Sequence, residues 1–131
     1  MKILVCGDRN WWNEEVVKEV LSQYQPDTVV IQGEARGADS AGKKAAEELG
    51  MTVIGFPAKW DELGRRAGIV RNLQMLDTNP DLVIAFHNFL PNSKGTKHTV
   101  TEALNRGIKV DLCNEKGIII HLKKEDTNGQ I

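Results

Sequence analysis

The chain has 131 residues, and its 17 basic and 18 acidic side chains give a formal net charge of −1. This length suits a single domain, and about two thirds of the surface of such a chain is buried on folding without help from disulfides or metals. The balanced charge excludes binding to nucleic acid or anionic lipid through overall basicity, and leaves only a local basic cluster for that purpose.

The first half of the chain alternates strand-like apolar runs with helical periodicity. Residues 3–6 are an apolar run that predicts a strand, and residues 13–24 repeat their apolar side chains at helical spacing. A second strand is predicted over 28–32, which is rich in β-branched residues. A helix over 39–49 and a third strand over 52–56 follow.

The second half continues the same alternation. A helix is predicted over 66–76, a strand over 81–86 and a further helix over 99–106. Two more strands are expected at 108–113 and 118–122, the last of them antiparallel at an edge of the sheet.

Strands that alternate with helices are typical of a mostly parallel sheet with helices on both faces. We therefore predict an α/β fold, a Rossmann-like doubly wound sheet in one domain over residues 1–122. Residues 123–131 are polar and are expected to form a frayed C-terminal tail. Sheets of this kind bind ligands beyond the carboxyl ends of their strands, so the residues just after each strand are the ones to examine.

Neither a membrane span nor a signal peptide is predicted. No apolar run approaches the roughly 20 residues that cross a bilayer, and the run at the N-terminus ends after about four residues. Cys6 and Cys113 lie far apart in apolar stretches, so we expect two buried thiols. A reducing cytoplasm is the expected location.

Glycines and cations gather in the turns that follow four of the predicted strands. Glycine lets backbone N–H groups approach a phosphate, a helix N-terminus is partly positive, and arginine matches phosphate oxygens with two parallel donors. The candidate ligand-binding residues are Gly7, Arg9, Gly33, Arg36, Gly37, Asp39, Trp60, Arg71, Asn72, Gly95, Thr96 and Lys97.

Two of these turns precede helices, and each has an ordinary structural alternative. The turn over 33–39 is interpreted as a phosphate site, although its glycines also suit a tight turn from strand to helix. Asp39 or Ser40 can cap the helix there, and the Asp39 carboxylate can instead pair with Arg36 or hold a ribose hydroxyl. Thr96 can cap the later helix and offer its hydroxyl to a ligand.

The helix over 66–76 has a polar side chain beside its apolar stripe. At about 100° per residue, Ile69, Leu73 and Leu76 share that stripe, Asn72 lies at its border and Arg71 lies well away from it. We expect Asn72 to hold a loop or a base and Arg71 to face the ligand. The alternative for Arg71 is a solvated position on the outer face.

Aromatic and metal-ligating residues contribute less to the prediction. Trp12 and Trp60 lie next to turns on the same edge, where a tryptophan either stacks on a base or packs in the core. The histidines, of which His87 follows a strand, share no metal-ligand spacing, so no metal site and no cofactor are expected. No nucleophile and base can be paired from spacing.

Several motifs follow one another in a specific order between about residues 3 and 112. They read Gly-Asp-Arg at 7–9, Gly-Glu-Ala-Arg-Gly-Ala-Asp at 33–39, Phe-Pro-Ala-x-Trp at 56–60, Gly-Arg-Arg-Ala-Gly at 64–68, Arg-Asn-x-Gln-Met at 71–75, Asp-Leu-Val-Ile-Ala-Phe at 81–86 and Gly-Thr at 95–96. In these motifs the chain resembles the SLOG superfamily, and within it the small YspA-like proteins of bacteria and phages. The resemblance implies a Rossmann-like fold, a nucleotide or nucleotide-derived ligand and a homodimer.

The LOG phosphoribohydrolases are a related branch that removes the base from nucleoside 5′-monophosphates. Their Arg-Lys-x-x-Met helix motif resembles residues 71–75, and their Pro-Gly-Gly-x-Gly-Thr-x-x-Glu loop resembles residues 91–99. Thr99 stands where that loop has its catalytic glutamate. The resemblance therefore implies phosphate binding more than hydrolysis, and Glu102 and Asp39 are the weak candidates for a catalytic carboxylate.

The leading hypothesis is a binding domain that senses or sequesters a nucleotide or a nucleotide-derived small molecule. The alternative is an N-glycosidic-bond hydrolase or transferase acting on nucleoside monophosphates, which needs a carboxylate near the anomeric carbon. A second alternative is a single-stranded DNA-binding module, although the net charge of −1 disfavours nucleic acid as a partner. No membrane partner is expected.

Overall fold

The computed structural model describes residues 1–127 and contains a six-stranded sheet. From one edge to the other, the strands are β3 (Thr52–Gly55), β2 (Val29–Gln32), β1 (Lys2–Gly7), β4 (Leu82–Phe86), β5 (Lys109–Cys113) and β6 (Ile119–Leu122). All neighbouring pairs from β3 to β5 are parallel, and β6 pairs antiparallel with β5. The predicted doubly wound α/β fold is confirmed, and so is its antiparallel edge strand.

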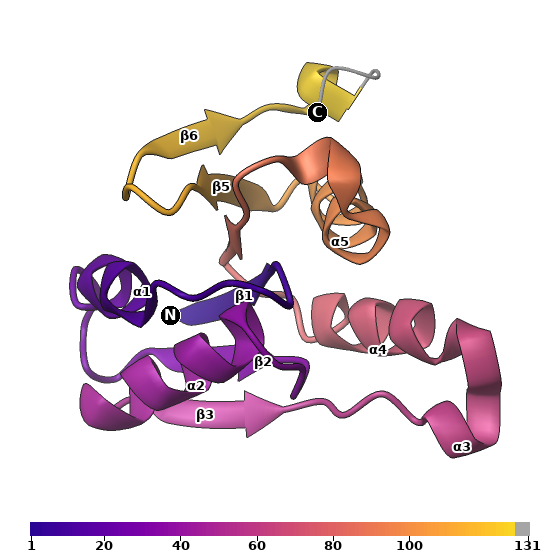
Figure 1. Ribbon diagram of the computed structural model, residues 1–131, viewed down its shortest axis with the longest axis horizontal. Helices are drawn as coiled ribbons and strands as arrows, with labels where there is room; N and C mark the ends of the chain where they lie inside the picture. The colour runs from indigo at the N-terminus through magenta and orange to yellow at the C-terminus, as the bar shows by residue number, and fades with distance from the viewer. Residues whose placement is uncertain (128–131) are drawn as a thin grey trace.

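Helices cover both faces of the sheet (Figure 1). The α-helices are α1 (Glu14–Leu21), α2 (Ala38–Glu48), α3 (Trp60–Leu63), α4 (Ala67–Leu76) and α5 (Lys94–Asn105). Short 3-10 turns, η1 (Gly64–Arg66), η2 (Leu90–Asn92) and η3 (Lys124–Thr127), join or follow them. Helices α1 and α2 pack on one face, and α4 and α5 pack on the other.

The central strand shows why the sheet is buried on both sides. Successive side chains of a strand point to opposite faces. Ile3 and Val5 pack with α1 and α2, whereas Leu4 and Cys6 pack with α4 and α5. Burying each aliphatic side chain contributes about 1.5–3 kcal/mol, so this alternation holds both helical layers against the strands whose carboxyl ends carry the candidate site.

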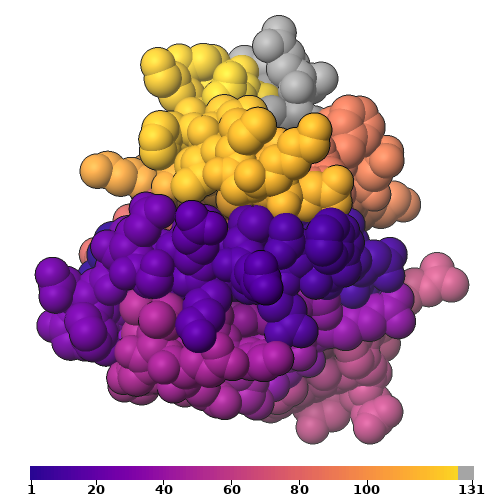
Figure 2. Space-filling model, turned by 60° about the vertical axis from the view of Figure 1, so that its left-hand side comes forward, coloured from indigo at the N-terminus to yellow at the C-terminus, as the bar shows by residue number. Residues whose placement is uncertain are grey.

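In Figure 2 the C-terminal part of the described chain, coloured orange to yellow, lies against the indigo N-terminal segment. Hydrogen bonds connect them: the Trp12 indole donates to the Glu115 carboxylate over 3.0 Å, and the Asn13 amide donates to the Glu115 carbonyl over 2.9 Å. Of the expected polar tail, residues 124–127 form η3, and residues 128–131 lie outside the described residues.

Two helix starts differ from the prediction. The N-cap of α2 is Gly37, because Asp39 lies inside the first turn and directs its carboxylate back to the preceding loop. Helix α5 begins at Lys94 rather than near 99, and Ser93 rather than Thr96 is its cap. The Ser93 hydroxyl accepts a hydrogen bond from the Thr96 N–H group. The start lies earlier than predicted because Ser93, rather than a residue next to the apolar run, supplies the capping hydroxyl.

The predicted apolar stripe of α4 was wrong at Ile69, whereas its member Leu76 is buried. Ile69 is 51% exposed. The residues that α4 buries are Ala67, Asn72, Met75 and Leu76. The start of α4, which contains Ile69, lies with α3 past the end of β3 (Figure 1).

Cys6 and Cys113 are both buried and unpaired, as expected from their apolar surroundings. Within residues 1–127, no helix is long and apolar enough to span a membrane.

Candidate functional site

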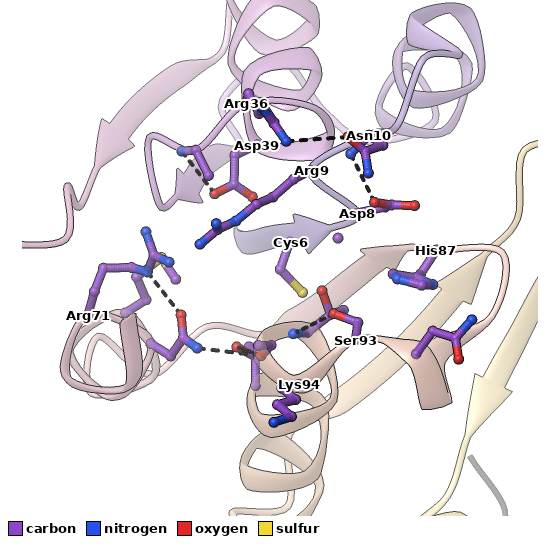
Figure 3. Close-up of a pocket in the computed structure, with 18 residues that line it drawn as sticks. Cys6, Asp8, Arg9, Asn10, Arg36, Asp39, Arg71, His87, Ser93 and Lys94 are labelled. Atoms are coloured by element: carbon purple, nitrogen blue, oxygen red, sulfur yellow. Dashed lines mark hydrogen bonds between the residues drawn. The ribbon is translucent and has the colours of Figure 1, made fainter. Parts of the chain in front are cut away.

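A crevice opens where the strand order reverses. From β1 the chain continues to β2 and β3 on one side, and from β4 it continues to β5 and β6 on the other. The connections that follow β1 and β4 therefore diverge and leave space at the carboxyl ends of these strands. This space has a volume of about 350 Å³. We call it the arginine cleft, and its charged side chains are Asp8, Arg9, Arg36, Asp39, Arg71 and Lys94 (Figure 3).

The fold brings most of the sequence-predicted candidates to this cleft. Those that line it are Gly7, Arg9, Arg36, Asp39, Arg71, Asn72, Gly95 and Thr96. Gly33 and Trp60 line a smaller pocket of about 210 Å³, which shares two of the arginines with the cleft.

The remaining candidates line neither space. Gly37 packs closely against the loop that follows β1, because a Cβ added at Gly37 would lie 2.3 Å from the Asp8 carbonyl oxygen. Lys97 lies on α5 outside both linings. Glu102, a candidate catalytic carboxylate, lies further along α5 and pairs with Arg106 over 3.4 Å. The geometry therefore gives Glu102 no contact with the cleft.

The turn over 33–39 is occupied by its own carboxylate. Asp39 accepts hydrogen bonds from the N–H groups of Gly33 and Ala35, over 3.2 and 3.3 Å. Burial raises the pKa of Asp39 to about 6, although both N–H groups and the nearby Arg71 favour the ionised form. Because these two backbone donors serve Asp39, they are not free for a phosphate, and this favours the alternative of a tight turn from strand to helix.

Arg71 connects three parts of the cleft wall. Its guanidinium donates to the Gly33 carbonyl through Nη1 and to the Asn72 amide oxygen through Nε. The Asn72 amide in turn donates to the Gly95 carbonyl over 3.5 Å. Burial lowers the pKa of Arg71, and Asp39 opposes that effect. These two hydrogen bonds use Nε and Nη1 and leave Nη2 free to donate to a ligand. Arg71 therefore connects two loops of the cleft wall and is also a candidate ligand-binding residue.

The start of α5 forms the opposite wall of the cleft. Ser93 caps the helix, and the Thr99 hydroxyl donates to the Gly95 carbonyl over 3.2 Å. No atom would meet a Cβ added at Gly95, so the helix start is open. The positive end of the helix dipole and Lys94 both favour an anion at this place.

Some cleft residues were outside the predicted ligand-binding set. They include Cys6, Asp8, Asn10, His87, Ser93 and Lys94. His87 accepts a hydrogen bond from the Phe89 N–H group through Nδ1, so its neutral ring carries the proton on Nε2. Burial lowers the pKa of His87, which favours that neutral form, whereas Asp8 opposes the shift. The sequence could have indicated them by their positions, because Cys6 lies at the end of β1, Asp8 and Asn10 follow β1, His87 follows β4, and Ser93 and Lys94 are at the start of α5.

Comparison with known proteins supports the family that the sequence motifs indicate. The sequence profile of the YspA, cpYpsA-related SLOG family matches residues 1–62. The Gene 61 protein of Mycobacterium phage D29 is 33% identical over 120 residues, covering 83% of this chain and 93% of that protein. The chain belongs to this SLOG family, which points to a nucleotide-related role. No solved structure matches it significantly.

Proposed function

We propose that this protein binds a small phosphate-containing ligand, a nucleotide or a nucleotide-derived molecule, in the arginine cleft. The observation that carries the proposal is the convergence of four cations from four segments of the chain: Arg9, Arg36, Arg71 and Lys94. They face a space of about 350 Å³, within the usual range for small-molecule sites.

The charges of the cleft favour an anionic group near α5. The carboxylate of Asp39 is already bonded to two backbone N–H groups, and Asp8 accepts a hydrogen bond from the Asn10 N–H group. Among residues 1–127, the Arg36 side chain has a single hydrogen bond, a long one of 3.5 Å to the Asn10 side-chain oxygen. Within residues 1–127 the Arg9 guanidinium makes no hydrogen bond or ion pair, and its interaction with the Asp39 carboxylate is a longer-range electrostatic one, so its N–H groups can donate to a phosphate.

The measurement that tests the proposal is calorimetric titration with nucleoside mono- and diphosphates, ADP-ribose and inorganic pyrophosphate. Arg9→Ala is expected to weaken anion binding by about 1.5–3 kcal/mol, the contribution of a charge-assisted hydrogen bond, with little change in stability. Arg65→Ala is the matched control, because Arg65 is an exposed arginine outside the cleft. Equal losses in the two variants, or no binding by the parent protein, would refute the proposed site.

We further propose binding without rapid hydrolysis. Cleavage of an N-glycosidic bond builds positive charge on the sugar, and a carboxylate placed beside it commonly contributes a factor of about 100–1,000 in rate. Thr99 lines the cleft with a hydroxyl that is bonded to the Gly95 carbonyl. Asp8 is the carboxylate that remains for the hydrolase alternative.

Base release from nucleoside monophosphates, followed by chromatography, separates these two functions. We expect no release above the buffer rate. Several turnovers per second, abolished in Asp8→Asn and unchanged in Glu102→Gln, would favour the hydrolase.

A further inference from the structure

A second compartment adjoins the arginine cleft. It is the pocket of about 210 Å³ described above, which we call the Trp60 pocket. Its residues beyond the shared arginines are Gly33, Glu34, Ala35, Pro57, Ala58 and Trp60. It therefore combines one carboxylate with an aromatic ring and apolar groups, whereas the cleft is dominated by cations.

The carboxylate of this pocket is held in a fixed position. Glu34 has a φ of 58°, in the left-handed region that residues other than glycine rarely adopt. Its N–H group donates to the Gln32 side-chain oxygen over 2.6 Å, and the Gln32 amide donates back to Glu34 Oε1 over 2.9 Å. Gln32 is fully buried at the end of β2, and Lys43 lies 3.3 Å from Glu34 Oε2.

The neighbouring strand leaves room for this carboxylate. A Cβ added at Gly55 of β3 would lie 1.7 Å from Glu34 Oε1, so any larger residue there would displace it. An ionised carboxylate accepts about four hydrogen bonds, and the partners of Glu34 use two of these positions. The Glu34 carboxylate is thus held in one orientation and can still accept about two hydrogen bonds from a ligand.

The aromatic wall of the pocket is supported on one side and open on another. A Cβ added at Gly68 would lie 3.4 Å from the Trp60 ring, so this ring rests against α4 where a side chain is missing. Half of the Trp60 surface is exposed. A ring supported in this way suits stacking with a nucleobase, because every base has an aromatic face.

We propose that the Trp60 pocket is a ribonucleoside subsite, in which Glu34 accepts hydrogen bonds from the two adjacent ribose hydroxyls and Trp60 stacks on the base. This inference rests on the proposed function of the arginine cleft, which takes the phosphate. Arg9 and Arg71 line both spaces, so a ligand whose phosphate lies in the cleft can extend into the pocket that Glu34 and Trp60 also line. The subsite therefore selects ribonucleotides over 2′-deoxyribonucleotides.

The experiment compares the affinity of each ribonucleoside 5′-monophosphate with that of its 2′-deoxy counterpart, and uses inorganic pyrophosphate as a probe of the cleft alone. In the parent protein we expect at least one ribonucleotide to bind roughly 10- to 100-fold more tightly than its deoxy form, the value of a hydrogen bond to a charged group. Glu34→Gln is expected to abolish this ratio and to leave pyrophosphate affinity unchanged.

Two further variants test the role of the Trp60 ring in binding the base. Trp60→Leu removes an exposed ring and is expected to weaken both nucleotide forms while pyrophosphate binding is retained. Trp12→Leu is the control, because Trp12 is 69% exposed and lies outside both spaces. Thermal melting checks that each variant is folded.

Each contrary result overturns a defined part of the inference. A ratio near one in the parent protein, with pyrophosphate bound, overturns the subsite and leaves the proposed function intact. Equal losses for both sugar forms in Glu34→Gln overturn the assignment of Glu34 to ribose. Absence of binding by pyrophosphate and by every nucleotide overturns the subsite together with the proposed function.

Discussion

The two helix starts at the cleft both contain glycine and a basic residue, but their backbone N–H groups are in opposite states. The turn before α2 directs its N–H groups to the buried Asp39 carboxylate, whereas the start of α5 is capped by Ser93 and remains open at Gly95. An anion-binding geometry therefore exists at both, but at the first it is satisfied from within the chain. The difference teaches that a glycine-rich turn marks a ligand site only where its donors have no internal acceptor.

The largest expected effect separates the glycines of the two helix starts. Gly37 has a φ of 75°, and an added Cβ would lie 2.3 Å from the Asp8 carbonyl oxygen. Gly37→Ala is therefore expected to reduce the free energy of unfolding by about 2–4 kcal/mol through backbone strain and overpacking. Gly95→Ala meets no atom and improves helix propensity, so it is expected to be neutral or stabilising by up to about 1 kcal/mol. Urea denaturation of both variants measures this contrast. Similar losses of unfolding free energy in the two variants would contradict the prediction.

The second prediction tests the internal anion through pH. The pKa of Asp39 is about 6 in the folded protein, above the 3.8 of a free aspartate. The folded state thus binds this proton more tightly, so the stability that Asp39 contributes is fully present below about pH 3.8 and is lost as pH rises through about 6. The loss is on the order of 3 kcal/mol, from about 1.4 kcal/mol for each pH unit that separates the two values.

Asp39→Asn removes that titration. The difference in unfolding free energy between the variant and the parent protein is expected to shift in favour of the variant between about pH 4 and 6 and to be constant above about pH 7. Urea denaturation at several pH values measures it. If the difference in unfolding free energy does not vary with pH, burial does not raise the pKa of Asp39, and the turn is an ordinary helix cap.

The smallest effect concerns the caps themselves. Ser93→Ala leaves the Thr96 N–H group without its acceptor and is expected to reduce stability by about 1 kcal/mol. Ser40→Ala is the matched control in the first turn of α2, where the N-cap is Gly37, and it should change stability by less than about 0.5 kcal/mol. Equal effects would remove the distinction between the two helix starts.

Local patterns were enough for the strands and for the order of layers. Runs such as 28–32 and 81–86 are apolar and rich in β-branched residues, and helical spacing separates them, so the parallel sheet and its carboxyl edge could be predicted. Helix boundaries were less accurate where a cap competes with a neighbour. Asp39 has the side chain of a cap, yet it is buried beside Arg71, and the first turn forms around it.

The sequence by itself determined which residues reach the edge of the sheet, because the position of a residue just after a strand follows from the alternation of strands and helices. Only the tertiary structure decided which of them face a ligand. Arg71 meets Gly33, and Glu34 meets Gly55, because β2 and β3 lie side by side in the sheet and α4 packs on one of its faces. Such contacts depend on distances between segments far apart in the chain, and local periodicity carries no information about those distances.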